Sequence, residues 1–157
     1  MSADGQELVI REARSGDLPA IVRLHEADAA IGQGDAWSDQ SRPAYEQAFA
    51  EIDRHPDHVL YVAEQGGEVV GTLLLSFMPG LTGRGARHAV LRAVQVSADR
   101  RSGGIGAQMV AVAEAEAARR GASLCELMSN KRRVDAHRFY ERLGYARSHY
   151  GFKKRLR

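Results

Sequence analysis

Cysteine and proline are scarce in this chain, and each shortage excludes a class of protein. Cys125 is the single cysteine among 157 residues, so neither an internal disulfide nor a cysteine-based metal site can form. Four prolines, 44% hydrophobic and 27% charged residues fall in the range of ordinary globular domains and outside that of disordered or collagen-like chains. We therefore expect a domain without a metal, in a reducing compartment such as the cytoplasm.

Long apolar runs and a strong net charge are also missing. No stretch approaches the roughly 18 apolar residues of a membrane span, and the N-terminal sequence MSADGQELVIREAR lacks the apolar core of a signal peptide. The formal net charge of +2 provides no clustered basic field for nucleic acid. The sequence thus predicts neither a membrane nor a nucleic-acid partner.

The length suits one domain over residues 1–157, since domains cluster at roughly 100 to 200 residues. A first strand around Val9–Ile10 precedes a helix, and helical spacing of apolar residues indicates a second helix over 42–54. Between the two helices, the polar stretch 31–41 around Trp37 predicts a loop that folds over a site.

Three apolar runs then predict antiparallel strands. The first two are joined by Gly66 and Gly67, a hairpin signal, and the third covers 88–98 after a glycine-rich turn at 80–85. Beyond them helices and strands alternate. We expect a helix over 106–120, a strand over 123–128, a helix over 133–143 and a last strand over 145–154.

The sharpest chemical signal is the segment Val96–Ala107, VSADRRSGGIGA, which passes from an apolar strand through a basic, glycine-rich turn into a helix. Backbone amides in such a turn can approach a ligand, and the free amides of the helix attract anions, so a diphosphate is the natural occupant. Two nucleotide motifs do not fit. A P-loop requires lysine followed by Ser or Thr where Ala107 and Gln108 stand, and the dinucleotide fingerprint requires Gly or Ala in place of Met109.

The segment does match the R-x-x-G-x-G core of the GCN5-related N-acetyltransferases (GNAT), with Arg101, Gly104 and Gly106 in register. Val96 holds the usual apolar position of that family in the preceding strand, whereas Ala98 stands where the family customarily has proline. The chain therefore resembles this family in its first motif.

A second block, DAHRFYERLGY at 135–145, resembles the following motif of the family, in which an aromatic-tyrosine pair precedes a glycine-aromatic step. The family tyrosine falls on Tyr140, which by resemblance donates a proton to the departing CoA thiolate. A phenol with a pKa near ~10 stays protonated at neutral pH and can protonate a thiolate with a pKa near ~8.5. Without the first motif, Tyr140 would be read as an ordinary packed aromatic.

The resemblance implies both a fold and a binding site. The fold is α+β in three layers, with a mixed but mostly antiparallel sheet of six or seven strands, about four flanking helices and a splay between the fourth and fifth strands. In that splay the family binds acetyl-CoA, the acetyl donor, and the Val96 amide would bind the thioester oxygen. The residues implied to contact acetyl-CoA are Val94, Val96, Arg101, Ser102, Gly103, Gly104, Ile105, Gly106, Ala107, Asn130, His137 and Tyr140.

The proton of the attacking amine has no obvious acceptor in the sequence. The fourth strand reads LRAVQ at 91–95, without the glutamate that relatives often place there. Candidate bases are His88, Glu126, Asp135 and His137, with a water chain as the alternative.

Further polar residues are candidates for binding the cofactor or for positioning it. Arg100–Arg101 and Lys131–Arg133 form two basic clusters that face either the CoA phosphates or solvent. Asn130 is a candidate for positioning, and Cys125 fits a buried thiol better than a nucleophile.

The acceptor is suggested by a resemblance to one branch of the family, the aminoalkylphosphonate N-acetyltransferases. It rests on ELMSN at 126–130, the ten residues from Asn130 to Tyr140, and the ending SHYGFKK at 148–154. This favours a small primary amine, including an anionic one, while acetyl-lysine and antibiotic-modifying roles stay open. A homodimer is also left open.

Two other functions come from different classes. One is a non-catalytic acyl-CoA-binding sensor or regulatory module, supported by the missing glutamate and opposed by Tyr140. The other, and the weakest, is a nucleic-acid binder.

Overall fold

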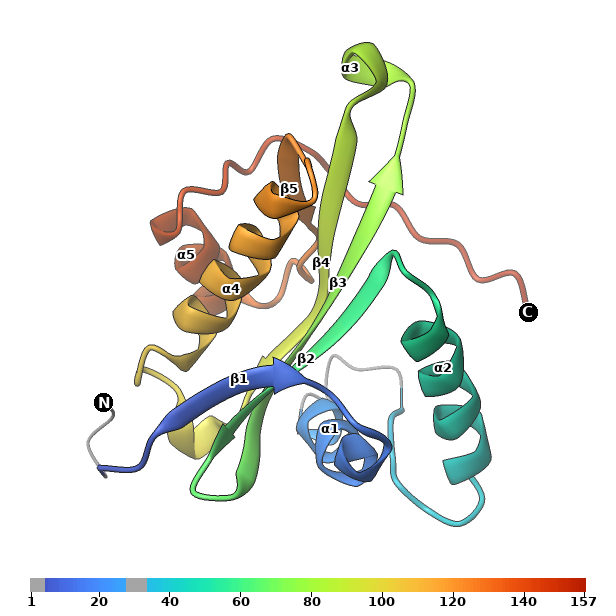
Figure 1. The fold of residues 1–157 in the computed structure, drawn as a ribbon, viewed down its shortest axis with the longest axis vertical. Helices are drawn as coiled ribbons and strands as arrows, with labels where there is room; N and C mark the ends of the chain where they lie inside the picture. Colours follow the sequence, from blue (N-terminus) through green and yellow to red (C-terminus); the bar gives the residue numbers. More distant parts are fainter. Residues whose placement is uncertain (1–4, 28–33) are drawn as a thin grey trace.

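The computed structural model describes residues 5–27 and 34–157. Its centre is one five-stranded sheet in the order β1-β2-β3-β4-β5 (Figure 1). The strands are β1 (Leu8–Glu12), β2 (His58–Gln65), β3 (Glu68–Pro79), β4 (Arg87–Val96) and β5 (Leu124–Leu127). Neighbouring strands from β1 to β4 are antiparallel, and β5 runs parallel to β4. The predicted mixed, mostly antiparallel sheet is confirmed.

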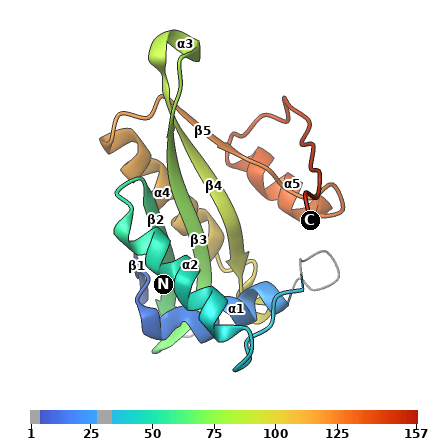
Figure 2. The same cartoon turned by 90° about the vertical axis from the view of Figure 1, so that its right-hand side faces the viewer.

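The helices lie on both faces of the sheet (Figures 1 and 2). On one face are α1 (Leu18–Glu26), which follows the short turn η1 (Ser15–Asp17), and α2 (Arg42–Arg54). On the other are α4 (Ile105–Arg119), which follows η2 (Ala98–Arg100), and α5 (Val134–Arg142). The four-residue α3 (Thr82–Gly85) lies at the tip of the β3–β4 connection. Of the predicted loop 31–41, residues 31–33 lie outside the described part, and Trp37 stacks on Tyr45 at 6.0 Å between ring centroids.

The main core lies between the sheet and α4. Leu73, Leu75 and Leu91 point to this face and are 0–1% exposed, as is Met109 of α4. The small side chain of Ala113 lets the helix approach the strands closely. A fully buried side chain of this kind stabilises the fold, and truncation of Met109 to alanine would lower the free energy of unfolding by about 2–5 kcal/mol.

The β2–β3 hairpin has the predicted two-residue turn. Gly66 and Gly67 both have positive φ, 60° and 80°, as a type I′ turn requires. The atoms nearest to a Cβ on Gly66 belong to the end of the exposed Gln6 side chain, which can move aside, so the positive φ is what favours glycine there.

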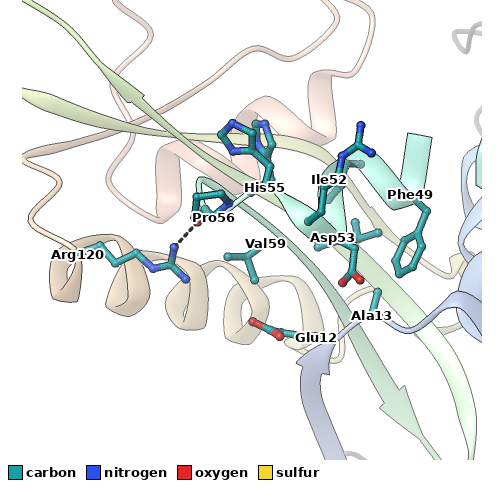
Figure 3. Close-up of a pocket in the computed structure, with 12 residues that line it drawn as sticks. Glu12, Ala13, Phe49, Ile52, Asp53, His55, Pro56, Val59 and Arg120 are labelled. Atoms are coloured by element: carbon teal, nitrogen blue, oxygen red, sulfur yellow. Dashed lines mark hydrogen bonds between the residues drawn. The ribbon is translucent and has the colours of Figure 1, made fainter. Parts of the chain in front are cut away.

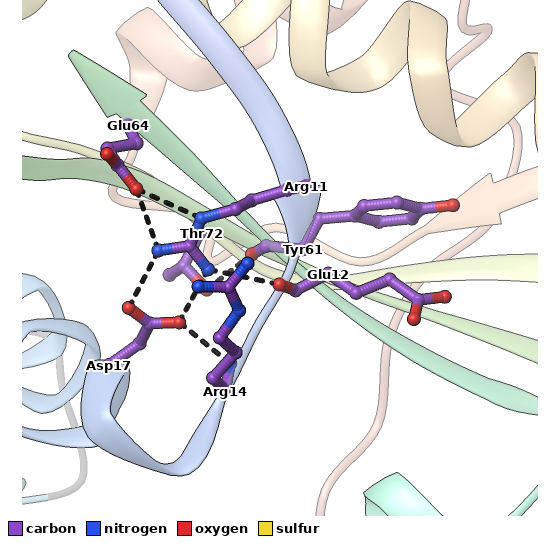
Figure 4. Close-up of polar contacts among 7 residues, drawn as sticks. All are labelled: Arg11, Glu12, Arg14, Asp17, Tyr61, Glu64 and Thr72. Carbon is purple, nitrogen blue, oxygen red and sulfur yellow. Dashed lines mark hydrogen bonds and ion pairs between the residues drawn. The ribbon is translucent and has the colours of Figure 1, made fainter.

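An ion-pair network joins the first strand to the start of α1 (Figure 4). Arg11 donates to both Asp17 and Glu64, each at 2.8 Å, and the Arg14 amide donates to Asp17 at 2.7 Å. These hydrogen bonds, led by the one from Arg11, lower the pKa of the Asp17 carboxyl. The network therefore fixes the angle at which α1 leaves β1.

The predicted last strand over 145–154 is wrong. Residues 145–157 form neither helix nor strand, and the sheet has five strands rather than six or seven. Four helices, α1, α2, α4 and α5, flank it as expected, and the short α3 at the tip of the β3–β4 connection was not foreseen. A strand exists only with a ladder partner, and within the described residues nothing pairs with the outer edge of β5. No helix in the described ranges is long and apolar enough to span a membrane.

Candidate active site

The sheet opens between β4 and β5. The two strands pair only where His88–Leu91 faces Leu124–Leu127, and β4 continues to Val96. Just past the last pair, β4 carries a bulge, since Arg92 opposes Leu74 and Gln95 opposes Thr72, leaving two residues of β4 against one of β3. Ala93 takes a positive φ of 51° there. A bulge increases twist and redirects a strand, so the end of β4 diverges from β5 as expected.

Backbone groups at the end of β4 face this opening. The Ser97 amide donates to the Val70 carbonyl at 2.8 Å, so alternation in the antiparallel ladder directs the Val96 amide and carbonyl away from β3. The carbonyl accepts from Nε of Arg101 at 3.2 Å. The Val96 amide thus points into the opening, and Val94, two residues earlier, is one of the two bulge residues.

The turn before α4 is held in an unusual backbone conformation. Ser102 and the helix N-cap Gly104 have φ of 71° and 82°. A serine there is strained by roughly 1 kcal/mol or more, which the surrounding structure must offset. Arg100 donates to the buried Oε1 of Gln65 at 3.0 Å and ties the turn to β2. Nearby, the Ser97 hydroxyl donates to Asp99 at 2.5 Å and lowers the pKa of that carboxyl.

The turn and the first helical residues offer amide donors. The hydrogen bonding of α4 begins with the Gln108 amide, which donates to the Gly104 carbonyl in the turn at 3.1 Å. Within the described residues, none of the amides from Ser102 to Ala107 has a hydrogen-bond acceptor, as expected at a helix start. Ser102, Gly103 and Gly104 are exposed, whereas the Ile105 side chain is 3% exposed and anchors the helix in the core.

Gly106 joins the two sequence motifs. A Cβ on this residue would lie 3.1 Å from Cζ of Phe139 and 3.6 Å from Cγ2 of Val96. The first turn of α4 therefore packs directly between α5 and the end of β4. This contact brings the amide-rich turn beside the helix that carries Tyr140.

Tyr140 is the buried residue of α5, 8% exposed, with its ring edge-on to Phe139 and Tyr145 at 5.1 and 6.0 Å between centroids. Burial raises the pKa of its phenol, and the charge of Arg133 opposes that rise. Within the described residues its hydroxyl has no hydrogen-bond partner, whereas that of Tyr145 donates to Glu114 at 2.7 Å. The raised pKa therefore keeps the proton on the Tyr140 phenol, and no hydrogen bond to another described residue engages it.

Asn130 and His137 build the turn before α5. The Asn130 side-chain oxygen accepts from the Arg132 amide at 3.0 Å, and its carbonyl accepts from the Arg133 amide at 2.9 Å. That carbonyl also lies 2.8 Å from Nε2 of His137. Because a carbonyl only accepts, Nε2 carries the proton. The structure thus places both predicted residues together, in a turn that orients α5.

Two of the candidate bases also come together. Nδ1 of His88 lies 3.4 Å from Oε2 of Glu126, across the parallel β4–β5 pair. By alternation His88 shares its face with Arg92, opposite α4, and Arg92 is exposed. Asp135 instead lies exposed in the first turn of α5. The sequence does not predict that His88 meets Glu126 or that Arg92 lies on the same face, because α4 separates β4 and β5 along the chain.

A hollow of about 240 Å³ lies elsewhere, between the end of α2 and strands β1 and β2 (Figure 3). Phe49, Ile52 and Val59 line it, and beside it Arg120 donates to the Pro56 carbonyl at 2.7 Å. It contains none of the predicted site residues. Within the described ranges no group of His, Cys, Asp or Glu is arranged to hold a metal.

A mixed sheet splayed between its parallel pair, with a glycine turn leading into the next helix, defines the acetyltransferase class indicated by the sequence motifs. A family profile agrees, since residues 18–145 match the Acetyltransferase (GNAT) family. The chain belongs to this family and is an acetyltransferase.

Three relatives extend the comparison. Aminoalkylphosphonate N-acetyltransferase of Salmonella typhimurium is 38% identical over 117 residues, 72% of this chain and 73% of that protein. A structure described as a transcriptional regulator from Bacillus halodurans C-125 superposes with a TM-score of 0.91 at 37% identity, over 96% of this chain and all of that one. An aminoglycoside N-acetyltransferase in complex with CoA shares the fold, with a TM-score of 0.79 at 15% identity over 100% and 99% of the two chains.

Proposed function

We propose that residues 1–157 form one cytoplasmic N-acetyltransferase domain that transfers the acetyl group of acetyl-CoA to the primary amine of a small molecule. The observation that carries this proposal is the contact at Gly106, where the amide-rich turn, the open end of β4 and the Tyr140 helix meet. These three parts supply an anion site, a carbonyl-binding amide and a proton donor. Together they suit direct attack of an amine on a thioester.

The turn fits the diphosphate of CoA. Its amides from Ser102 to Ala107 are uncommitted, and the dipole of the 15-residue α4 favours negative charge at this end. Arg101 is exposed beside them. The CoA-bound aminoglycoside N-acetyltransferase, which has the same fold, is consistent with this use of the opening.

The chain's own groups serve each stage of the transfer. The Val96 amide would polarise the thioester carbonyl, and a preorganised donor of this kind stabilises the developing oxyanion by about 3 kcal/mol. The amine nitrogen bonds to the carbonyl carbon as the carbon–sulfur bond breaks. The departing thiolate takes the Tyr140 proton, which burial keeps on the phenol until then.

The proton of the amine goes to His88 in this proposal. An alkylammonium has a pKa near ~10.4, so an acceptor is needed at neutral pH. An imidazole can accept a proton, and Glu126 at 3.4 Å can orient the ring and offset its charge. The pair lies in the paired stretch of β4 and β5, which ends at Leu91 and Leu127, and it couples an imidazole to a carboxylate, whereas His137 is engaged in the turn before α5.

The acceptor class is inferred from charge. Arg92 is exposed on the face that also carries His88, at the mouth of the opening. A guanidinium suits an anionic group on the acceptor, and the curated relative is an aminoalkylphosphonate N-acetyltransferase. We therefore include small amines that carry a phosphonate or phosphate among the acceptors.

A regulator that senses acyl-CoA is the second candidate. It is favoured by the similarity to the Bacillus halodurans structure described as a transcriptional regulator, and by a fourth strand without an acid at 91–95. The uncommitted phenol of Tyr140 favours catalysis instead.

Release of free thiol from acetyl-CoA, measured with a panel of amines that includes an aminoalkylphosphonate, tests the proposal. We expect turnover with at least one amine, and Tyr140→Phe should lower it about a hundredfold through loss of the general acid, with little change in acetyl-CoA affinity by calorimetry. Tyr145→Phe is the matched control, because its hydroxyl belongs to the same aromatic cluster but donates to Glu114. Binding of acetyl-CoA without turnover of any amine would favour the sensor.

A further inference from the structure

A buried glutamine lies at the end of β2, next to the turn that precedes α4. Gln65 is the last residue of the strand and is 1% exposed. By alternation its side chain shares the face of Tyr61 and Ala63, which belong to the core under α4. A side-chain amide is costly to bury unless it is hydrogen-bonded. The position therefore suits a glutamine only where polar partners are within reach.

Both ends of the Gln65 side chain have such a partner. Nε2 donates to the Gln6 carbonyl at 3.2 Å, in the segment before β1. Oε1 accepts from Nη1 of Arg100 at 3.0 Å. An amide can bind a carbonyl and a guanidinium at once, because it is a donor at one end and an acceptor at the other. Gln65 thus joins the N-terminal segment to the turn before α4.

Arg100 is held by the protein, unlike its neighbour Arg101. Its side chain is 23% exposed, and Nε lies 3.7 Å from Oδ2 of Asp99. Its amide donates to the Ser97 carbonyl at 2.9 Å. Arg101 is exposed. The two arginines form one basic cluster in the sequence, but in the structure Arg100 points back to β2.

The turn requires support because its backbone is strained. Ser102 has a φ of 71°, in a region that residues other than glycine rarely adopt. Hydrogen bonds fix the turn to the β2–β3 hairpin at two points, from the Ser97 amide to the Val70 carbonyl at 2.8 Å and from Arg100 to Gln65. The end of the hairpin and the turn lie side by side in Figure 1. The second of these points is only two residues from Ser102.

From this arrangement we propose that Gln65 is a positioning residue for the diphosphate of CoA. Gln65 acts through Arg100, which holds residues 98–104 in the conformation that presents the amides of 102–107. The inference rests on the proposed function, in which these amides bind the diphosphate. Affinity falls with the fraction of molecules that have the binding-competent conformation, so loss of this link weakens acetyl-CoA binding and leaves the reacting groups in place.

A comparison of acetyl-CoA with acetyl-pantetheine, which lacks the diphosphate, tests this role. We expect Gln65→Met to lower kcat/KM for acetyl-CoA about tenfold, through KM, with kcat/KM for acetyl-pantetheine nearly unchanged. Gln65→Glu keeps the acceptor for Arg100 and should recover most of the preference for acetyl-CoA. Thr72→Val is the matched control. It removes another buried hydrogen bond of the hairpin, from the Thr72 hydroxyl to the Tyr61 carbonyl at 3.1 Å, and should affect both donors alike.

The two donors also separate the role of Gln65 from the proposed function. A wild-type chain that uses acetyl-pantetheine as well as acetyl-CoA would overturn both, because the turn would then not hold the diphosphate. A wild-type preference for acetyl-CoA that persists unchanged in Gln65→Met would overturn the positioning role alone. An equal loss with the two donors in Gln65→Met would show that the side chain only supports the fold, and this would also overturn that role.

Calorimetry with acetyl-CoA tests the link to Arg100 and requires no amine. Gln65→Met and Arg100→Met remove the two sides of one hydrogen bond, so the double variant should lose no more affinity than either single variant, about tenfold. Independent effects would instead multiply to about a hundredfold. That result would show that Gln65 does not act through Arg100, and it would overturn the proposal.

Discussion

At the residue scale, His88 and Glu126 show how a site is completed by side chains that the sequence keeps apart. Their contact at 3.4 Å depends on the parallel register in which Val90 faces Glu126 and His88 faces Leu124. A slip of one residue would turn either side chain to the opposite face of the sheet. The proposed proton acceptor is therefore a product of strand pairing.

His88→Gln tests this role. The amide keeps much of the size of the ring but cannot take up a proton, so turnover in the thiol-release assay should fall about a hundredfold while acetyl-CoA affinity stays unchanged. His55→Gln is the control, because His55 is exposed at the end of α2 and is not among the residues of the proposed site. Full activity of His88→Gln would place the proton acceptor elsewhere or in a water chain.

At the scale of elements, the first turn of α4 carries two separate requirements for glycine. Gly104 takes a positive φ at the start of the helix. Gly106 has helical backbone angles, and its missing side chain leaves room for the Phe139 ring. The R-x-x-G-x-G motif thus combines a backbone requirement of the turn with a packing requirement of α5. The second requirement becomes apparent only when the position of α5 is known.

Gly106→Ala should therefore displace α5. The added Cβ meets the Phe139 ring at 3.1 Å, so we expect a several-fold loss of acetyl-CoA affinity by calorimetry, with a change in unfolding free energy of no more than about 1 kcal/mol. The double variant Gly106→Ala, Phe139→Leu makes room and should recover most of the affinity. Failure of that recovery would mean that the glycine is required by the ligand rather than by α5.

At the scale of the whole molecule, the Arg11 network couples the edge of the sheet to the layer formed by α1. Arg11 and Asp17 are 21% and 12% exposed in their side chains, so the pair is better shielded from solvent than a surface ion pair. It connects β1 with the beginning of α1, which follows closely in the sequence, and with β2, which lies more than 40 residues later.

Asp17→Asn should lower the free energy of unfolding by about 1–3 kcal/mol at pH 7, measured by urea denaturation. The native pKa of Asp17 lies below its reference value of 3.8, so its stabilisation is present above that value and is lost as the pH falls through the native pKa. The difference between wild type and variant should consequently shrink below about pH 4. Asp39→Asn, at a fully exposed carboxyl, is the control and should leave the free energy of unfolding nearly unchanged. A difference that does not depend on pH would contradict this account.

Apart from α3, the sequence alone predicted the order of elements up to α5, and the limits predicted for α2, α4 and α5 agree within about a residue; it also identified the turn over 101–107 and Tyr140 as candidates. These features depend on local patterns, which neighbours along the chain are sufficient to produce. It also predicted a strand over 145–154, and this was wrong, because residues 145–157 form neither helix nor strand.

Tertiary structure decided the rest. The bulge at Ala93, the His88–Glu126 contact and the packing of Gly106 on Phe139 all depend on which segments lie side by side. A strand needs a ladder partner and a site needs side chains from several elements, and both are set by contacts between residues far apart in the chain. Such contacts leave no periodic signal in the sequence from which they could be predicted.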